Sequence, residues 1–176
     1  MDLSMLELSD QEIARRTSLN ELRSLGINPY PAAEYQVTAY AQEIINSYPE
    51  GNEEREALLR EQRVRLAGRI MGRRIMGKAS FVELADSTGR IQIYITRDSI
   101  ADGENTDLYN IVFKKCLDIG DFIGIEGYVF KTQTGEVSVH ALSLTVLSKS
   151  LRPLPIVKEK DGKVFDGFTD PEQRYR

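Results

Sequence analysis

Apolar and polar side chains alternate in several short stretches in the middle of the chain, and this two-residue period predicts β-strands. The first stretch contains Val64, Leu66 and Ile70, and the others span residues 80–85, 90–96, 121–131 and 136–147. Between the third and fourth stretches, residues 107–117 have a helical pattern that closes at Gly120. Three strands, a helix and two further strands are the order of an OB-fold, a small five-stranded β-barrel.

Helical spacing dominates the chain before this barrel. Ser9 followed by Glu12 is a capping box, and the apolar positions that follow it stop at Gly26. Thr38 is a candidate cap for a second helix, and residues 52–62 form a charged, helix-prone third segment. We therefore expect helices to precede the barrel.

The chain divides into three parts on this pattern. We expect an N-terminal helical extension at residues 1–62, an OB-fold domain at residues 63–149, and an extended linker at residues 150–176. The linker is predicted because Pro153 and Pro155 disfavour a barrel strand.

The turn at residues 86–89 sets the register of the first hairpin. The opposed pairs are then Ala85 with Arg90, Leu84 with Ile91, Glu83 with Gln92, Val82 with Ile93, and Phe81 with Tyr94. One face is apolar and belongs to the core: Val82, Leu84, Ile91, Ile93 and Ile95. The other face is polar but holds two aromatic rings: Phe81, Glu83, Arg90, Gln92, Tyr94 and Thr96. In the last strand the apolar positions change parity, which predicts a bulge near Ala141.

Aromatic rings on the polar face of an OB-fold sheet can stack on unpaired bases, and each such stack contributes about 1–3 kcal/mol. Gln92 lies diagonal to Phe81, and its amide offers the donor and the acceptor that a uracil-like base edge requires. Arg73, Arg74 and Lys78 follow the first strand and could meet phosphates or a base. In the alternative interpretation, Phe81 and Tyr94 form a cross-strand pair that packs beneath the N-terminal helices.

The net charge of −4 conceals an uneven distribution of charge. Residues 1–62 contain 5 Lys and Arg against 12 Asp and Glu, residues 63–149 contain 12 against 10, and residues 150–176 contain 6 against 5. One basic run has no acid within it: Arg63, Arg65, Arg69, Arg73, Arg74 and Lys78. A local positive field of this kind favours nucleic acid docking, and an ordinary solvated face is the alternative.

Several classes of function find no support in the sequence. There is no run of about 18 apolar residues for a membrane span and no secretory signal pattern at the start. The single cysteine, Cys116, fits a reducing, cytoplasmic compartment, and we interpret it as a small buried hydrophobe. His140 is interpreted as a surface or RNA-facing residue without a nucleophile partner. Asp118, Asp121 and Glu126 do not form a convincing set of metal ligands.

The run RRIMGKASF at residues 73–81, followed by GRIQIYITRD at 89–98 and LRPLP at 151–155, resembles the anticodon domain of class II lysyl-tRNA synthetases. The resemblance covers most of residues 10–30 and nearly all of residues 63–176. Aspartyl- and asparaginyl-tRNA synthetases share the barrel but not these sequence motifs. An anticodon domain of that kind remains an alternative.

The resemblance implies roles for particular residues. In the family, the aromatic residue at the position of Phe81 stacks on the central anticodon uridine, and the glutamine at the position of Gln92 reads that base. The second arginine of the RRIMG run, Arg74, helps to hold the base, and Glu136 lies near the anticodon. We add Arg73, Lys78 and Tyr94 as candidates from their positions on the same hairpin face and loop. The implied partner is the anticodon loop of tRNA(Lys).

Family members attach lysine to tRNA with ATP and Mg²⁺ and act as homodimers. Their catalytic motifs follow the RYR that stands here at residues 174–176, so we expect no catalytic, cofactor-binding or metal-binding residue in this chain, which would be an inactive fragment. A general single-strand binder with an OB-fold, or a scaffold that docks another subunit through the acidic helices at residues 9–61, are the alternative functions.

Overall fold

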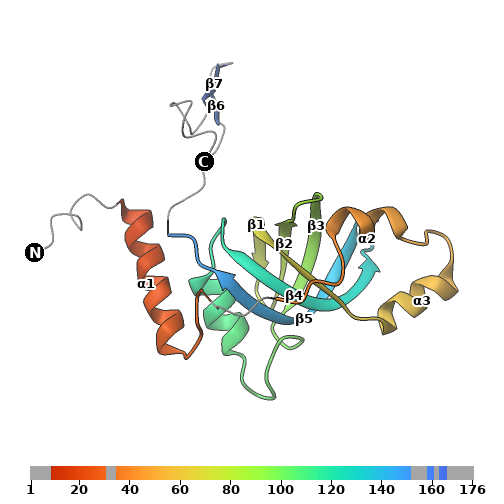
Figure 1. Ribbon diagram of the computed structural model, residues 1–176, viewed down its shortest axis with the longest axis horizontal. Coiled ribbons are helices and arrows are strands. Elements are labelled where there is room, and N and C mark those ends of the chain that lie inside the picture. Colours follow the sequence, from red (N-terminus) through yellow and green to blue (C-terminus); the bar gives the residue numbers. More distant parts are fainter. Residues whose placement is uncertain (1–8, 31–34, 152–157, 161–162, 166–176) are drawn as a thin grey trace, which may run out of the picture.

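The computed structural model describes residues 9–30, 35–151, 158–160 and 163–165. Its centre is a closed five-stranded barrel (Figure 1). The strands are β1 (Val64–Met76), β2 (Ala79–Ala85), β3 (Arg90–Thr96), β4 (Phe122–Lys131) and β5 (Val137–Ser148). Their order around the barrel is β1-β2-β3-β5-β4, in which β3 and β5 are parallel and the other pairs are antiparallel. The predicted OB-fold is confirmed.

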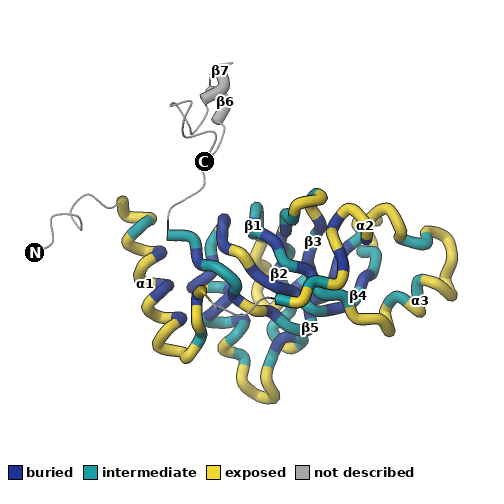
Figure 2. The backbone as a smooth tube through the Cα atoms, viewed as in Figure 1, coloured by how far each residue is buried: buried dark blue, intermediate teal, exposed yellow. Residues whose placement is uncertain are grey.

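The barrel closes on the apolar face that the strand alternation predicted. Val82, Leu84, Ile91, Ile93 and Ile95 are all buried, with at most 2% of each residue exposed. Figure 2 shows this alternation of buried and partly exposed positions along β2 and β3. Burial of these side chains is the main source of stability, because each contributes about 1.5–3 kcal/mol when it leaves water.

The ladders contain three register shifts, one of them at the start of β4 between Phe122 and Ile123, and the other two change which side chains face outward near the candidate site. In β1 the register shifts between Ile70 and Gly72, so that Met71 is the extra residue against β2. Between β4 and β5 it shifts where Gly127 pairs with Ala141, which confirms the bulge predicted near that residue. A one-residue shift moves every following side chain to the opposite face.

Among the described residues, three helices precede the barrel, as predicted. α1 (Asp10–Ser24) is capped by Ser9, whose hydroxyl accepts a hydrogen bond from the Glu12 amide at 3.2 Å. α3 (Glu53–Glu61) is capped in the same way by Asn52 and contacts β4. The helices lie at the two ends of the barrel, with α1 at one and α2 and α3 at the other (Figure 1).

The cap predicted for the second helix is wrong. α2 (Ala41–Ser47) begins after Tyr40, and Thr38 instead accepts a hydrogen bond from the Arg65 amide in β1 at 2.8 Å. The β2–β3 turn supplies the cap, because Asp86 accepts from the Ala41 amide at 2.7 Å and Thr88 from the Gln42 amide at 3.1 Å. A distant turn therefore satisfies the first amides of this helix.

The helix predicted between β3 and β4 is present as η2 (Leu108–Cys116), a π-helix that packs against α1. Its aromatic face joins the core, where Tyr109 and Phe113 are both buried. The Tyr109 hydroxyl donates to the Gly77 carbonyl at 2.8 Å and lies 2.7 Å from the Ser80 hydroxyl. Cys116 is buried and burial raises the pKa of its thiol to about 11, so its interpretation as a buried hydrophobe is confirmed.

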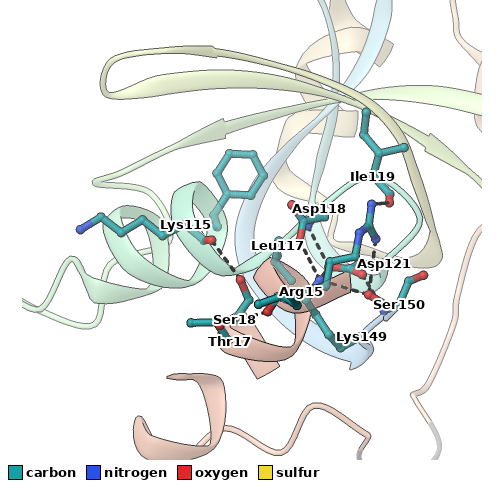
Figure 3. A network of polar contacts seen from close by, with 12 residues as sticks. Arg15, Thr17, Ser18, Lys115, Leu117, Asp118, Ile119, Asp121, Lys149 and Ser150 are labelled. Atoms are coloured by element: carbon teal, nitrogen blue, oxygen red, sulfur yellow. Dashed lines mark hydrogen bonds and ion pairs between the residues drawn. The ribbon is translucent and has the colours of Figure 1, made fainter. Parts of the chain in front are cut away.

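A buried polar network fixes the end of the barrel where β5 finishes (Figure 3). The Lys149 ammonium lies 2.8 Å from Asp121 and 2.9 Å from Asp118. Asp121 also accepts from the Ser150 amide at 2.6 Å, and Arg15 in α1 donates to the carbonyl of Ile119 at 3.0 Å. The network joins α1, the segment before β4, and the chain that follows β5.

Only part of the expected linker at residues 150–176 is described. Beyond Leu151 the described residues form two short strands, β6 (Lys158–Lys160) and β7 (Lys163–Phe165), which pair antiparallel. Pro153, Pro155 and the RYR sequence at residues 174–176 lie outside the described residues.

Candidate nucleic-acid interface

The outer face of the β2–β3 hairpin holds the candidate site. The observed register pairs Phe81 with Tyr94, Glu83 with Gln92, and Ala85 with Arg90, as the turn at residues 86–89 predicted. Phe81, Gln92 and Tyr94 are all partly exposed on this face. The hairpin forms because both strands alternate strictly and the four-residue turn admits one register.

Phe81 and Tyr94 do form a cross-strand pair, with ring centroids 5.2 Å apart and planes tilted by 39°. The pair is nevertheless not covered by the N-terminal helices. Two open hollows flank Phe81, and the residues that line them come from strands and turns of the barrel alone. The interpretation in which this pair packs beneath the helices is therefore wrong, and the aromatic face is accessible.

The first hollow has a volume of about 510 Å³ and lies on one side of Phe81. Its lining combines aromatic, amide and charged groups: Gly72, Arg73, Arg74, Phe81, Val82, Glu83, Arg90, Ile91, Gln92 and Glu136. The second, of about 500 Å³, lies on the other side: Arg74, Phe81, Gln92, Tyr94, Phe130, Thr132, Gln133 and Thr134. Arg74, Phe81 and Gln92 border both hollows, so these three residues occupy the centre of the face.

The two neighbouring arginines have different surroundings. Arg74 is exposed, and its guanidinium carbon lies 5.6 Å from the centroid of the Phe81 ring. The guanidinium of Arg73 donates to the carbonyls of Phe113, at 2.9 Å, and Leu117 near the end of η2. Of the two, Arg74 has its charge available at the aromatic face, whereas that of Arg73 is engaged within the fold.

The remaining predicted residues divide in the same way. Glu136, which directly precedes β5, lines the first hollow together with Phe81 and Gln92. Lys78 is exposed in the turn between β1 and β2 and lines neither hollow. The structure thus brings Phe81, Gln92, Arg74 and Glu136 together, and leaves Lys78 at the margin.

Sequence reasoning missed one wall of the second hollow. Phe130 in β4 faces it, together with the turn of Thr132, Gln133 and Thr134. The Phe130 ring lies 6.1 Å from the ring of Tyr94. Its position in the alternation was a usable signal, because Phe130 follows the buried Val129 and shares the outward parity of Tyr128.

An ion pair crosses the face beside the first hollow. Arg90 and Glu83 lie 3.0 Å apart, and the side chains of both are about half exposed. An exposed pair of this kind contributes little to stability, about 0–1 kcal/mol. Its effect is to neutralise two charges at the border of the hollow, which leaves Arg74 and Glu136 as the charged groups of opposite sign nearest to the aromatic centre.

His140 is half-buried on the same face of the sheet, next to Tyr94 in the parallel β3–β5 pair. Its Nε2 lies 2.9 Å from the Ser99 hydroxyl and its Nδ1 lies 2.8 Å from the Tyr128 hydroxyl. Burial lowers the pKa of His140 below its ordinary value of 6.5. The sequence predicts a surface or RNA-facing residue without a nucleophile partner. The contact with Ser99 could not be predicted, because Ser99 reaches His140 from the turn after β3.

The described residues hold neither a cluster of metal ligands nor a membrane-spanning helix. Within residues 9–30, 35–151 and the two short strands, no group of three His, Cys, Asp or Glu side chains is placed to hold a metal ion. In this described part of the chain, no helix has the length and apolar character to cross a membrane.

Comparison with known proteins identifies relatives of the barrel and of the whole chain. Residues 64–147 match the family model of the tRNA anticodon OB-fold nucleic acid binding domain. This range begins at the first residue of β1 and ends one residue before the end of β5. The match therefore coincides with the barrel that carries Phe81, Gln92 and Arg74.

Curated relatives match over nearly the full chain. It is 63% identical over 174 residues to a lysine–tRNA ligase of Porphyromonas gingivalis, which covers 99% of this chain and 29% of that protein. It is 63% identical over 169 residues to one of Azobacteroides pseudotrichonymphae, 96% of this chain and 32% of that protein. For Christiangramia forsetii the identity is 52% over 173 residues, 98% of this chain and 29% of the relative. The chain spans about a third or less of these proteins.

Proposed function

We propose that the β2–β3 face of this chain reads the anticodon loop of a lysine tRNA. Residues 64–147 match the tRNA anticodon OB-fold family model, and the chain is similar to lysine–tRNA ligases. The observation that carries the proposal is the accessible Phe81 ring between two hollows, with Gln92 and Arg74 at the border of both. A flat ring flanked by open space and by hydrogen-bonding groups suits an unpaired base.

Phe81 supplies the stacking surface in this proposal. A base that enters either hollow meets the ring, and the stack contributes about 1–3 kcal/mol. Tyr94, whose ring lies 5.2 Å from that of Phe81, supports it from the neighbouring strand and borders the second hollow. Because every base has an aromatic face, stacking alone gives affinity and little sequence preference.

Gln92 supplies the sequence preference. Its amide presents one acceptor oxygen and two donor hydrogens at the border of both hollows. A uracil edge carries a donor N–H between acceptor carbonyls, which an amide can match with two hydrogen bonds. Cytosine has no ring N–H in its neutral form and replaces one carbonyl with an amino group. If the amide keeps the orientation that suits uracil, its oxygen faces the unprotonated ring nitrogen of cytosine, so two acceptors meet and binding energy is lost.

Charged groups hold the loop around the base. Arg74 can stack on a base or bind a phosphate, since its guanidinium is exposed above Phe81. Glu136 faces the first hollow and can accept hydrogen bonds from a neighbouring base. Lys78 acts at longer range on the phosphate backbone from its exposed turn. Arg73 has the weakest case, because the η2 carbonyls already bind its guanidinium.

The activity of a longer protein is part of the proposal. The relatives are named lysine–tRNA ligases, and we propose that this chain serves such an enzyme, which joins lysine to tRNA(Lys) with ATP and Mg²⁺ as a cytoplasmic homodimer. The described residues offer no metal-ligand group, so neither ATP nor Mg²⁺ is assigned to them. In this division of labour the chain contributes recognition of the tRNA and no chemical step.

The test is binding of this chain to an anticodon stem-loop with the sequence UUU. Phe81→Ala should weaken binding by about 1–3 kcal/mol, because one stack is lost. Phe122→Ala removes a ring that is 37% exposed and lines neither of the two hollows, so it should leave the affinity unchanged. Equal affinities of wild type and Phe81→Ala would overturn the proposal.

A second measurement separates anticodon reading from general single-strand binding. Replacing the central uridine by cytidine should weaken binding if Gln92 reads the base edge, and Gln92→Ala should abolish the difference between the two loops. A general binder would bind both loops equally, with a salt dependence of about −0.7 in log–log slope for each phosphate neutralised. That result would favour the alternative function.

A further inference from the structure

We propose that His140 is a positioning residue for the base-stacking face, held in one tautomer by a directed chain of hydrogen bonds and holding Tyr94 in turn against Phe81. The inference rests on the proposed function, since it concerns how the stacking ring is kept in place. It assigns a task to four side chains that lie beside the stacking rings: Thr96, Ser99, Tyr128 and His140.

The hydrogen-bond chain begins at the end of β3. The Ser99 amide donates to the Thr96 hydroxyl oxygen at 3.2 Å, and the Thr96 hydroxyl donates to the Ser99 oxygen at 2.6 Å. The Ser99 hydroxyl lies 2.9 Å from His140 Nε2, and His140 Nδ1 lies 2.8 Å from the Tyr128 hydroxyl. These hydrogen bonds therefore link the turn after β3 to β5, and β5 to β4.

The direction of the first bond leads to one tautomer. The Ser99 oxygen accepts the Thr96 proton, and we infer that its own proton is donated to His140 Nε2. On this assignment Nε2 carries no proton, and a neutral imidazole carries its proton on Nδ1, which donates to Tyr128. The lowered pKa of His140, caused by burial, favours the neutral ring that this arrangement requires.

The imidazole ring oriented in this way lies beside Tyr94 on the same face of the sheet. It stands edge-on to Tyr94, with centroids 5.1 Å apart and an interplanar angle of 84°. Tyr94 and His140 are also register partners across the parallel β3–β5 pair. Tyr94 in turn lies 5.2 Å from Phe81. A rotation of the imidazole would therefore release Tyr94, and through it the ring on which the base stacks.

The first test needs no RNA. The chain contains one histidine, so the imidazole ¹⁵N resonances of a labelled sample belong to His140 alone. At pH 7.5 we expect a neutral ring with a protonated Nδ1 and an unprotonated Nε2, and in Ser99→Ala a mixture of tautomers. The opposite tautomer in the wild type, or an unchanged spectrum in Ser99→Ala, would overturn the proposal.

The second test asks whether the effect reaches the stack. Ser99→Ala should weaken binding of the UUU stem-loop about threefold to tenfold, the size expected when the loss of one hydrogen bond is expressed in binding. It should not weaken binding of a loop with an abasic central position, because that loop has no base to stack. Ser99→Thr, which keeps the hydroxyl, should restore the wild-type affinity.

The outcomes separate this inference from the proposed function. If the wild type binds the UUU and abasic loops equally, the stacking function itself fails. If the wild type discriminates and Ser99→Ala weakens both loops equally, or neither, the positioning role fails while the function stands. Tyr128→Phe removes the acceptor of Nδ1–H and keeps the ring, and it provides the same comparison should Ser99→Ala not fold.

Discussion

Arg74 lies directly opposite Phe81 in the β1–β2 ladder, with its guanidinium carbon 5.6 Å from the centroid of the ring. The bulge at Met71 creates this relationship. After the bulge, the β1 side chains that would otherwise face the core face outward, and the others face inward. Arg74 therefore shares the outer face with Phe81, while Arg73 lies opposite the buried Val82. One inserted residue thus decides which of two adjacent arginines is available to a ligand.

The two arginines should therefore respond differently to the same substitution. Arg74→Met should weaken binding of the UUU stem-loop about twofold to fivefold, the size of one exposed cation–π contact, and leave thermal stability unchanged. Arg73→Met should reduce the free energy of unfolding by about 1.5–3 kcal/mol, because it removes charged hydrogen bonds to two η2 carbonyls. Binding titrations and urea unfolding of both variants check this, and a reversed pattern would refute the assignment of faces.

Lys149 is expected to be the most sensitive charge in the described part of the barrel. Its side chain and that of Asp121 are completely buried, so Lys149→Met leaves an uncompensated carboxylate in the interior. We expect the free energy of unfolding at pH 7 to fall by about 3–5 kcal/mol. The matched control is Glu50→Gln, which breaks the exposed ion pair with Lys131 and should cost at most about 1 kcal/mol. Equal losses in the two variants would contradict this prediction.

Asp86 links the stability of α2 to pH. Burial raises the pKa of its carboxyl. Hydrogen bonds from Thr88, Ala41 and Gly89 lower the pKa by more than burial raises it, so the pKa lies below the ordinary value of 3.8. Asp86→Ala should cost about 0.5–2 kcal/mol at pH 7, as the loss of a helix cap does. Since the folded-state pKa is the lower one, this contribution is present above pH 3.8 and disappears as the pH falls through the folded-state pKa.

The measurement for Asp86 is chemical denaturation of wild type and variant across this acid range. The difference in unfolding free energy should be constant from pH 7 to about pH 5 and shrink below it. Ser87→Ala, in the same turn but exposed, should show no such trend. A difference that grows on acidification would show that the sign is wrong.

Gly127 should tolerate no side chain. A Cβ at this position would collide with the carbonyl oxygen of His140 in the neighbouring strand, and backbone cannot move aside without breaking the ladder. We expect Gly127→Ala to reduce the free energy of unfolding by about 3 kcal/mol or more, at the upper end of overpacking costs. Gly72→Ala, whose nearest contact would be 3.5 Å away at the Glu83 carboxylate, should remain close to wild type in thermal unfolding.

The β2–β3 hairpin could be predicted from sequence because its information is local. Phe81 to Ala85 and Arg90 to Tyr94 alternate without interruption, and a four-residue turn joins them, so the register and the face of each side chain follow. The order of strands and helix then identified the barrel. For the same reason, the alternation predicts the outer face of the sheet for Phe81 and Gln92, where the structure has them.

Features that depend on distant contacts were beyond the sequence. Thr38 has the chemistry of a helix cap, but it bonds to Arg65 while Asp86, 45 residues from Ala41, supplies the cap of α2. The face of Arg73 could not be read from alternation, because the bulge at Met71 follows from packing against β2. His140 lacked an apparent partner since Ser99 meets it only after β3 and β5 pair.

The network around Lys149 has a consequence for how the molecule opens. Arg15 reaches from α1 to the carbonyls of Ile119 and Ser150, while Tyr30 donates to the carbonyl of Lys149 at 2.6 Å. These hydrogen bonds connect the first helix to the end of the last barrel strand, although the two elements are more than a hundred residues apart in the sequence. In amide hydrogen exchange we expect α1 and the end of β5 to unfold as a single cooperative unit. The chain at residue 151 is therefore attached to a well-protected part of the barrel.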